Sequence, residues 1–225
     1  MGRLEHLLQP GRGAIRELPP PFVRIMKNME QVSIEPLKRE EISETARLFA
    51  LAFSTRPGLI KMLKGQRDKE RRAIAMFEFP LKHLTGNTLV AKKDNRVVGA
   101  IRFVEWPHCQ LSPLQTLRFL PTMLAEMRST ALHHARQGLT WYRLDPKQPH
   151  WHIDPIAVLP EMQKQGIGSR LMTRFCEQMD EDGGKAYLET DKPEYVRFYE
   201  HFGFEVIREA NVRGRHFWFM WRKHL

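Results

Sequence analysis

The sequence predicts a mixed α/β fold, because alternating strand patterns and amphipathic helix patterns follow one another along most of its 225 residues. The last third of the chain gives the clearest order: a strand, a glycine-containing turn, a helix, a strand, a short helix and two more strands. One strand, two helices and a hairpin are expected before it. We therefore expect a central, mostly antiparallel sheet with helices on both faces.

The first half of the chain supplies these earlier elements. The expected segments are a strand at 32–34, helices at 41–53 and 68–84, and hairpin strands at 88–92 and 97–106. Asp94-Asn95 is the turn signal of the hairpin. Pro80 lies inside the second helical pattern and is expected to break it, because proline removes a helix hydrogen bond.

The most informative stretch runs from Trp151 to Ser169. An apolar strand passes through Leu159-Pro160 into Gln163-Lys164-Gln165-Gly166-Ile167-Gly168-Ser169, and apolar residues then recur every four positions. A helix therefore begins at the turn, and its first amides lack internal partners at the positive end of the helix dipole. Two glycines let a phosphate group approach these amides closely. The stretch predicts a diphosphate-binding turn.

Three kinds of phosphate-binding turn compete for this pattern. A Walker loop needs Gly-Lys-Ser/Thr at the turn, and the turn lacks it. A dinucleotide-binding turn needs a third glycine three positions after Gly168, where Leu171 stands. The third kind, Gln/Arg-x-x-Gly-x-Gly after a strand ending in Val-x-Pro, resembles the acetyl-CoA loop of the GNAT superfamily of N-acetyltransferases. On these residues alone, a tight turn without a ligand is the alternative.

The downstream residues make the resemblance more specific. The segments Leu188-Glu189-Thr190, Phe198-Tyr199-Glu200, Phe202-Gly203-Phe204 and Trp218-Phe219-Met220 fall as in puromycin N-acetyltransferase and its bacterial relatives, and Pro149-His150-Trp151 does so before the turn. The likeness covers residues 149–225. Members usually carry asparagines near the start of the Tyr199 helix, where this chain has Lys192 and Tyr195.

The resemblance implies the GNAT fold, with a sheet that splays at the cofactor strand, and acetyl-CoA as co-substrate in the gap. Pro155 fits a local bulge in that strand, since proline cannot donate to a sheet ladder. The residues implied to bind the cofactor are Ile156, Ala157, Val158, Gln163, Lys164, Gln165, Gly166, Ile167, Gly168 and Ser169.

Acetyl transfer to an amine needs a proton acceptor for the amine and benefits from a proton donor for the departing thiolate. Tyr199 matches the tyrosine that most members of the superfamily use as this donor. The base stays open among three residues. Glu189 belongs to the Leu-Glu-Thr element, His152 titrates near neutrality, and Glu105 ends the neighbouring strand.

A metal site is the alternative interpretation of the same strand. His150, His152 and Asp154 alternate on one face, and such ligands can hold zinc. Pro155 follows directly and supplies no ligand, and superfamily members need no metal. Cys109 and Cys176 occupy no metal-binding spacing, and we expect both to be buried thiols in a reducing cytoplasm. We therefore expect no metal.

Residues 107–148 form a long insertion between the hairpin and the cofactor strand. Ser112-Pro113 is a plausible helix start. A helical stripe follows, formed by Leu117, Leu120, Leu124, Met127 and Ala131. We expect this stripe to pack against the rest of the domain and the insertion to form a wall of the acceptor pocket.

Composition limits the other possibilities. No apolar run approaches the length of a membrane span, and residues 1–31 are expected to be a mobile arm before a single domain at 32–225. The net charge is +10, and the excess is densest at Arg56, Lys61, Lys64, Arg67, Lys69, Arg71 and Arg72. No aromatic residue interleaves that run, so we expect solvated helix faces rather than a nucleic-acid surface.

These observations favour a cytoplasmic, acetyl-CoA-dependent N-acetyltransferase that acts on a primary amine of a small molecule. Two other functions stay open: acetylation of a protein N-terminus or lysine, and CoA binding by a regulatory module without catalysis. A homodimer is a further open alternative.

Overall fold

The computed structural model describes residues 32–223, and the predicted N-terminal arm lies outside them. Its helices are α2 Ile42–Phe53, α3 Pro57–Leu63, α4 Lys69–His83, α5 Pro113–Met127, α6 Ala131–Leu144, α7 Ile167–Glu181 and α8 Pro193–Glu200. Its strands are β1 Val32–Pro36, β2 Asn87–Lys93, β3 Arg96–Glu105, β4 Trp151–Val158, β5 Ala186–Thr190, β6 Glu205–Val212 and β7 Arg215–Arg222.

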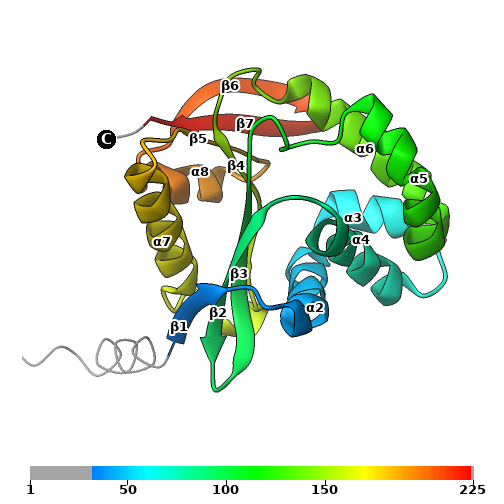
Figure 1. Ribbon diagram of the computed structural model, residues 1–225, viewed down its shortest axis with the longest axis horizontal. Helices are drawn as coiled ribbons and strands as arrows, with labels where there is room; N and C mark the ends of the chain where they lie inside the picture. Colours follow the sequence, from blue (N-terminus) through cyan, green and yellow to red (C-terminus); the bar gives the residue numbers. More distant parts are fainter. Residues whose placement is uncertain (1–31, 224–225) are drawn as a thin grey trace, which may run out of the picture.

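The strands form one seven-stranded sheet in the order β1-β2-β3-β4-β5-β7-β6. All neighbours are antiparallel except β4 and β5. Helix α7 lies on one side of the sheet, and α2 to α6 lie on the other (Figure 1). The predicted mixed sheet with helices on both faces is therefore confirmed.

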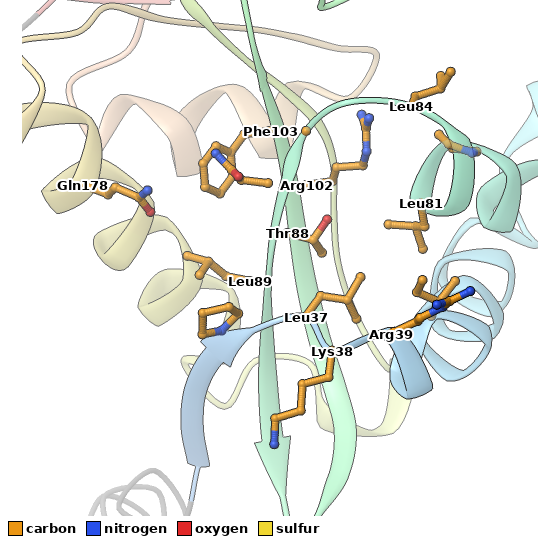
Figure 2. A pocket seen from close by; sticks show the side chains of 15 residues that line it. Leu37, Lys38, Arg39, Leu81, Leu84, Thr88, Leu89, Arg102, Phe103 and Gln178 are labelled. Carbon is orange, nitrogen blue, oxygen red and sulfur yellow. The ribbon is translucent and has the colours of Figure 1, made fainter.

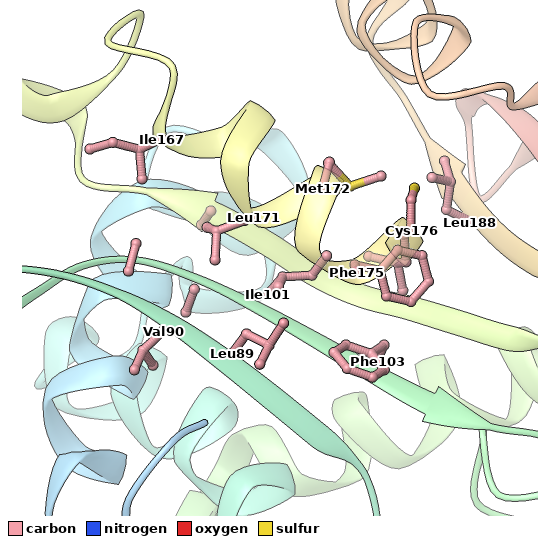
Figure 3. Packing of buried hydrophobic residues seen from close by; sticks show 14 of the residues in the cluster. Leu89, Val90, Ile101, Phe103, Ile167, Leu171, Met172, Phe175, Cys176 and Leu188 are labelled. Carbon is pink, nitrogen blue, oxygen red and sulfur yellow. The ribbon is translucent and has the colours of Figure 1, made fainter. Parts of the chain in front are cut away.

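The main core joins α7 to the sheet. Phe175 meets Phe103 edge to face, with ring centroids 5.0 Å apart. Figure 3 shows this layer of buried side chains, which includes Leu89, Ile101, Phe103, Ile167, Leu171 and Phe175. Gly99 keeps the contact close, because a Cβ there would lie 3.0 Å from Ile167 Cγ2 and 3.2 Å from Leu171 Cδ1. This packing fixes the start of α7 against the end of β4.

The β2–β3 hairpin is confirmed. Asp94 and Asn95 have φ angles of 51° and 60°, as a two-residue hairpin turn of this hand requires. The predicted bulge at Pro155 is also confirmed. Ile101 of β3 pairs with Ile156 of β4, and Phe103 pairs with Ile153. Asp154 and Pro155 of β4 therefore both stand opposite one β3 residue, Arg102.

Three expectations in the helical half were wrong. Helix α4 runs through Pro80 to His83, because its neighbour Phe79 is fully buried and packs edge to face on Phe119 of α5. Helix α3 begins at Pro57 inside the basic run, where no separate helix was expected.

The stripe on the insertion is the third error. Ser112 caps α5 as predicted, but Leu117 and Leu124 are 66% and 44% exposed. Met127 and Ala131 of the same stripe are buried as expected, and they join Met123, which lies outside the stripe, in a cluster with α3 and α4. Two overlapping apolar stripes run along this helix, and only its neighbours decide which one is buried. The insertion also forms two helices, α5 and α6, rather than one.

Candidate active site

The parallel ladder between β4 and β5 is short. It consists of two pairs, Trp151 with Ala186 and His152 with Tyr187. The following part of β4 therefore has no strand partner on the β5 side, which is the expected splay. Beyond the bulge this free edge carries Ile156, Ala157 and Val158, and all three line a cavity of about 820 Å³.

The glycine turn closes one end of this cavity. Gly166 has φ 80° and ψ −3°, a left-handed conformation that favours glycine, and it caps α7 without a side chain. The first intrahelical bond runs from the Arg170 amide to the Gly166 carbonyl at 3.0 Å. The amides of residues 167–169 precede that bond at the positive helix end. They are placed to bind an anion, and Lys164, Lys192 and Arg56 also line the cavity.

Tyr199 of α8 lies where this cavity meets a second one of about 330 Å³. Its hydroxyl makes no hydrogen bond to any residue between 32 and 223, and its side chain lies near Phe198 and Phe204. Burial raises the pKa of Tyr199 strongly, with the Tyr195 charge next in importance, so the phenol is protonated at neutral pH. Tyr199 can therefore donate a hydrogen bond to a group that spans both cavities.

The second cavity has acidic groups and an apolar wall. Glu189, Asp191 and Asp154 supply carboxylates, and Trp141 of α6 and Phe217 of β7 supply aromatic surface. Asp191 accepts a hydrogen bond from Arg56 Nη1 at 2.8 Å and also pairs with Arg215. Arg56, predicted to lie on a solvated face, is instead only 15% exposed in its side chain. Two of the carboxylates, Glu189 and Asp154, form no salt bridge with an arginine within the described residues, although Asp154 interacts electrostatically with Arg102.

The Glu189 carboxylate contacts a buried histidine, His152. His152 Nε2 lies 3.0 Å from Glu189 Oε2, and its Nδ1 lies 2.9 Å from Asp145 Oδ1. Asp145 is also 3.7 Å from His150 Nε2, which lies 3.6 Å from Cys109 Sγ. This chain of contacts, which we call the histidine cluster, consists of Cys109, Asp145, His150 and His152 with Glu189 at its cavity end.

Burial and charge act in opposite directions on the pKa values of the histidine cluster. Burial opposes the charged form of His152, but the Glu189 and Asp145 carboxylates outweigh it and hold its pKa well above the usual range. Burial would raise the pKa of Asp145, yet hydrogen bonds from His150 and His152 lower it to about 2. The same balance raises the pKa of His150 to about 9 and lowers that of Cys109.

A third cavity, of about 430 Å³, lies elsewhere, against β2, β3 and the segment after β1 (Figure 2). Its charged lining residues are Lys38, Arg39 and Arg102. The Arg102 guanidinium donates to the Thr85 carbonyl at 2.7 Å and is nearly fully buried. This cavity offers no carboxylate, histidine or thiol in its lining.

A profile of the acetyltransferase (GNAT) family matches residues 58–204, about two thirds of the chain. This chain belongs to the GNAT family. The match spans the free edge of β4, the glycine turn and α8, which are the elements that build the two cavities.

Solved structures show the same fold. A structure described as histone acetyltransferase HPA2 and related acetyltransferase from Corynebacterium glutamicum superposes with a TM-score of 0.66 at 18% identity, over 87% of this chain and 97% of that one. An N-acetyltransferase from Staphylococcus aureus gives 0.60 at 16%, over 84% and 99%. An Arabidopsis thaliana protein in complex with the bisubstrate analogue CoA-Ac-MVNAL gives 0.50 at 15%, over 86% and 99%.

The structure brings most of the residues expected from the GNAT resemblance together. Nine of the ten expected cofactor residues line the large cavity. Gln165 does not, because its side chain turns back and donates to the Glu161 carbonyl at 3.2 Å. Tyr199 and Glu189 line the small cavity, whereas His152 lies behind Glu189 and is 2% exposed. Glu105 is exposed at the end of β3 and lines neither cavity.

Two members of the histidine cluster were missed. Cys109 follows β3 and Asp145 follows α6, and neither has a motif spacing to His150 and His152. Their meeting depends on the path of the insertion, which no local pattern reveals. Arg56 was missed for a similar reason, since it resembles its solvated basic neighbours in sequence.

None of the helices between residues 32 and 223 combines the length and apolar character that crossing a bilayer requires. Both cysteines are buried free thiols, as expected.

Proposed function

We propose that this GNAT protein transfers an acetyl group from acetyl-CoA to a primary amine of a small molecule. The observation that carries the proposal is the junction of the two cavities at Tyr199. One cavity offers bare helix amides and positive charge, and the other offers carboxylates with an apolar wall. An anionic carrier and a cationic acceptor would meet at this residue.

Acetyl-CoA fits the larger cavity on chemical grounds. The amides of Ile167, Gly168 and Ser169 would hold its diphosphate, with Lys164 beside them. A Cβ at Gly168 would lie in ordinary van der Waals contact with Phe198 and Val158, 3.8 Å from each. The free edge of β4 offers main-chain groups to the amides of the pantetheine arm. Acetyl-CoA supplies an activated acetyl thioester, and the chain orients it toward the acceptor.

Glu189 is the residue to which we assign the role of base. Its side chain is 15% exposed and faces the acceptor cavity, while His152 holds one of its oxygens. The carboxylate first accepts a proton from the bound ammonium group, and the freed lone pair of the nitrogen then forms the bond to the acetyl carbon. His152 acts through Glu189 as a positioning residue, and the proposal assigns no step to Glu105.

Tyr199 serves the departing sulfur. When the carbon–sulfur bond breaks, the electron pair stays on sulfur, and the Tyr199 hydroxyl donates to the thiolate. The hydroxyl has no competing partner in the described chain, and its raised pKa keeps it protonated. The products are an N-acetyl amide and free CoA thiol.

A small acceptor is favoured by the shape and size of the second cavity. Its volume is about 330 Å³, and Trp141 of α6 and the β6–β7 hairpin residues Arg215 and Phe217 form part of its wall. Pockets of this size suit small molecules. This supports an aminonucleoside or similar compound, in line with the resemblance to puromycin-acetylating proteins. The two buried thiols are compatible with the reducing cytoplasm.

The deciding experiment follows the release of free CoA thiol with a panel of small amines, N-terminal peptides and lysine peptides. We expect turnover with small amines, and Glu189→Gln should lower kcat/KM about 100-fold. Glu205→Gln, an exposed residue of β6, is the matched control and should be unchanged. Turnover with peptides alone would replace the small acceptor by a protein. Acetyl-CoA binding without turnover on any amine would support the regulatory module.

A further inference from the structure

We propose that the histidine cluster is a structural zinc site whose ligands are Cys109, Asp145, His150 and His152. Each residue offers one ligand atom, and all four atoms lie within 4.8 Å of one another. A thiolate, two imidazoles and a carboxylate form a ligand set typical of Zn²⁺. The inference goes beyond acetyl transfer and does not depend on it.

Two of the distances between ligand atoms already fit a tetrahedral ion, and a third is too short. Zinc bonds of about 2.3 Å to sulfur and about 2.1 Å to nitrogen or oxygen place neighbouring ligand atoms about 3.4–3.6 Å apart. The Cys109 Sγ to His150 Nε2 distance is 3.6 Å, and the His150 Nε2 to Asp145 Oδ1 distance is 3.7 Å. His152 Nδ1 lies 2.9 Å from Asp145 Oδ1, so this one pair must separate by about half an ångström to admit the ion.

The outer nitrogens of both histidines are fixed in the way that zinc ligands require. His150 Nδ1 lies 2.7 Å from the Gln148 carbonyl, to which it can only donate. His152 Nε2 lies 3.0 Å from Glu189 Oε2. Each outer nitrogen therefore has an acceptor for its proton, and the inner nitrogens, His150 Nε2 and His152 Nδ1, face Cys109 and Asp145 and would give up their protons when zinc binds. A carbonyl or carboxylate acceptor behind the ring is the usual second partner of a zinc-bound histidine.

Charge and burial agree with a bound ion. Cys109, Asp145, His150 and His152 are exposed by 8%, 7%, 3% and 2%. A thiolate and a carboxylate balance the two charges of Zn²⁺, which makes such burial tolerable. Tyr187 and Trp221 cover the cluster with ring centroids 5.5 and 5.6 Å from that of His150. With four protein ligands and no open position, the site is structural rather than catalytic.

The ligands come from three separate parts of the chain. Cys109 follows β3, and Asp145 follows α6. His150 directly precedes β4, and His152 is its second residue. One ion would therefore fasten both ends of the insertion to the sheet. It would also fix the His152 ring that holds Glu189 at the acceptor cavity.

The test is the metal content of the full chain, purified without a histidine tag and dialysed against metal-free buffer. Elemental analysis should find about one zinc per chain, and Cys109→Ser should lose it. Cys176→Ser is the matched control, because Cys176 is equally buried but lies in the α7 core away from any histidine of the cluster. Glu189→Gln should weaken zinc binding about tenfold, as expected for a residue that supports a ligand.

A second set of measurements uses only the wild-type chain, so it tests the proposal even if the variants fail to fold. Replacing zinc by Co²⁺ in the wild-type chain should give a thiolate-to-metal absorption band, and adding Zn²⁺ to the stripped protein should raise its Tm. A folded wild-type protein that carries no stoichiometric metal and shows neither effect would overturn the proposal. It would leave the cluster as a hydrogen-bonded network. None of these measurements uses turnover, so a failure of the proposed acetyl transfer would be seen separately.

Discussion

Replacing Gly166 by Asp and by Asn tests whether the amides at the start of α7 hold the diphosphate. Gly166 adopts φ 80° directly before these amides. Asn and Asp have nearly the same shape, and both tolerate left-handed backbone better than most residues. Both variants should therefore have about the same backbone strain at position 166. They differ by one negative charge beside the proposed phosphates.

The expected difference follows from Coulomb's law. A carboxylate about 6 Å from two phosphate charges repels them by about 3 kcal/mol at an effective dielectric constant of about 40, and this repulsion weakens the binding free energy of acetyl-CoA. Screening over a Debye length of about 8 Å at 0.15 M salt reduces this to about 1.3 kcal/mol, a factor of about ten in Kd. At 0.01 M salt the Debye length is about 30 Å, and the factor rises to about 50.

Isothermal titration of acetyl-CoA into both variants at the two salt concentrations measures this ratio. Thermal melts of both proteins check that the shared backbone strain has not unfolded either one. Equal affinities for Asp and Asn, or a ratio that does not change with salt, would show that the diphosphate lies away from this turn.

Three further predictions concern other parts of the molecule. Tyr199→Phe should lower kcat about 100-fold while leaving the Kd of acetyl-CoA unchanged in titration, and loss of affinity instead would make Tyr199 a packing residue. Gly99→Val should destabilise the fold by about 2 kcal/mol in urea unfolding, because its side chain would collide with Ile167; an unchanged midpoint would contradict the tight contact. Burial raises the pKa of the Cys176 thiol to about 11, so at pH 8 its thiolate fraction is about 100-fold below that of an ordinary thiol. Its alkylation, followed by peptide mass spectrometry, should be correspondingly slow and should speed up as pH rises toward 11.

The helical half shows how far local pattern reaches. Pro80 is a strong local signal, yet the buried contact of Phe79 with α5 keeps the helix intact past it. Leu117 and Leu124 have the spacing of a buried face, but α4 covers the neighbouring face of α5 instead. In both cases tertiary packing contributes more free energy than the local helix preference does. This packing energy depends on contacts distant in the chain, so a single sequence does not reveal it.

The sequence by itself determined the strand, glycine turn and helix that hold the proposed diphosphate site, and it placed Tyr199 on the following short helix. These features are local, since a few neighbouring residues set the backbone of a turn, a cap or a strand. Only the tertiary structure decided that Arg56 faces the acceptor cavity and that Cys109 and Asp145 meet His150 and His152. The last four residues are separated by up to 43 positions (109 to 152). Their distances depend on how the insertion folds back onto the sheet, which no spacing along the chain encodes.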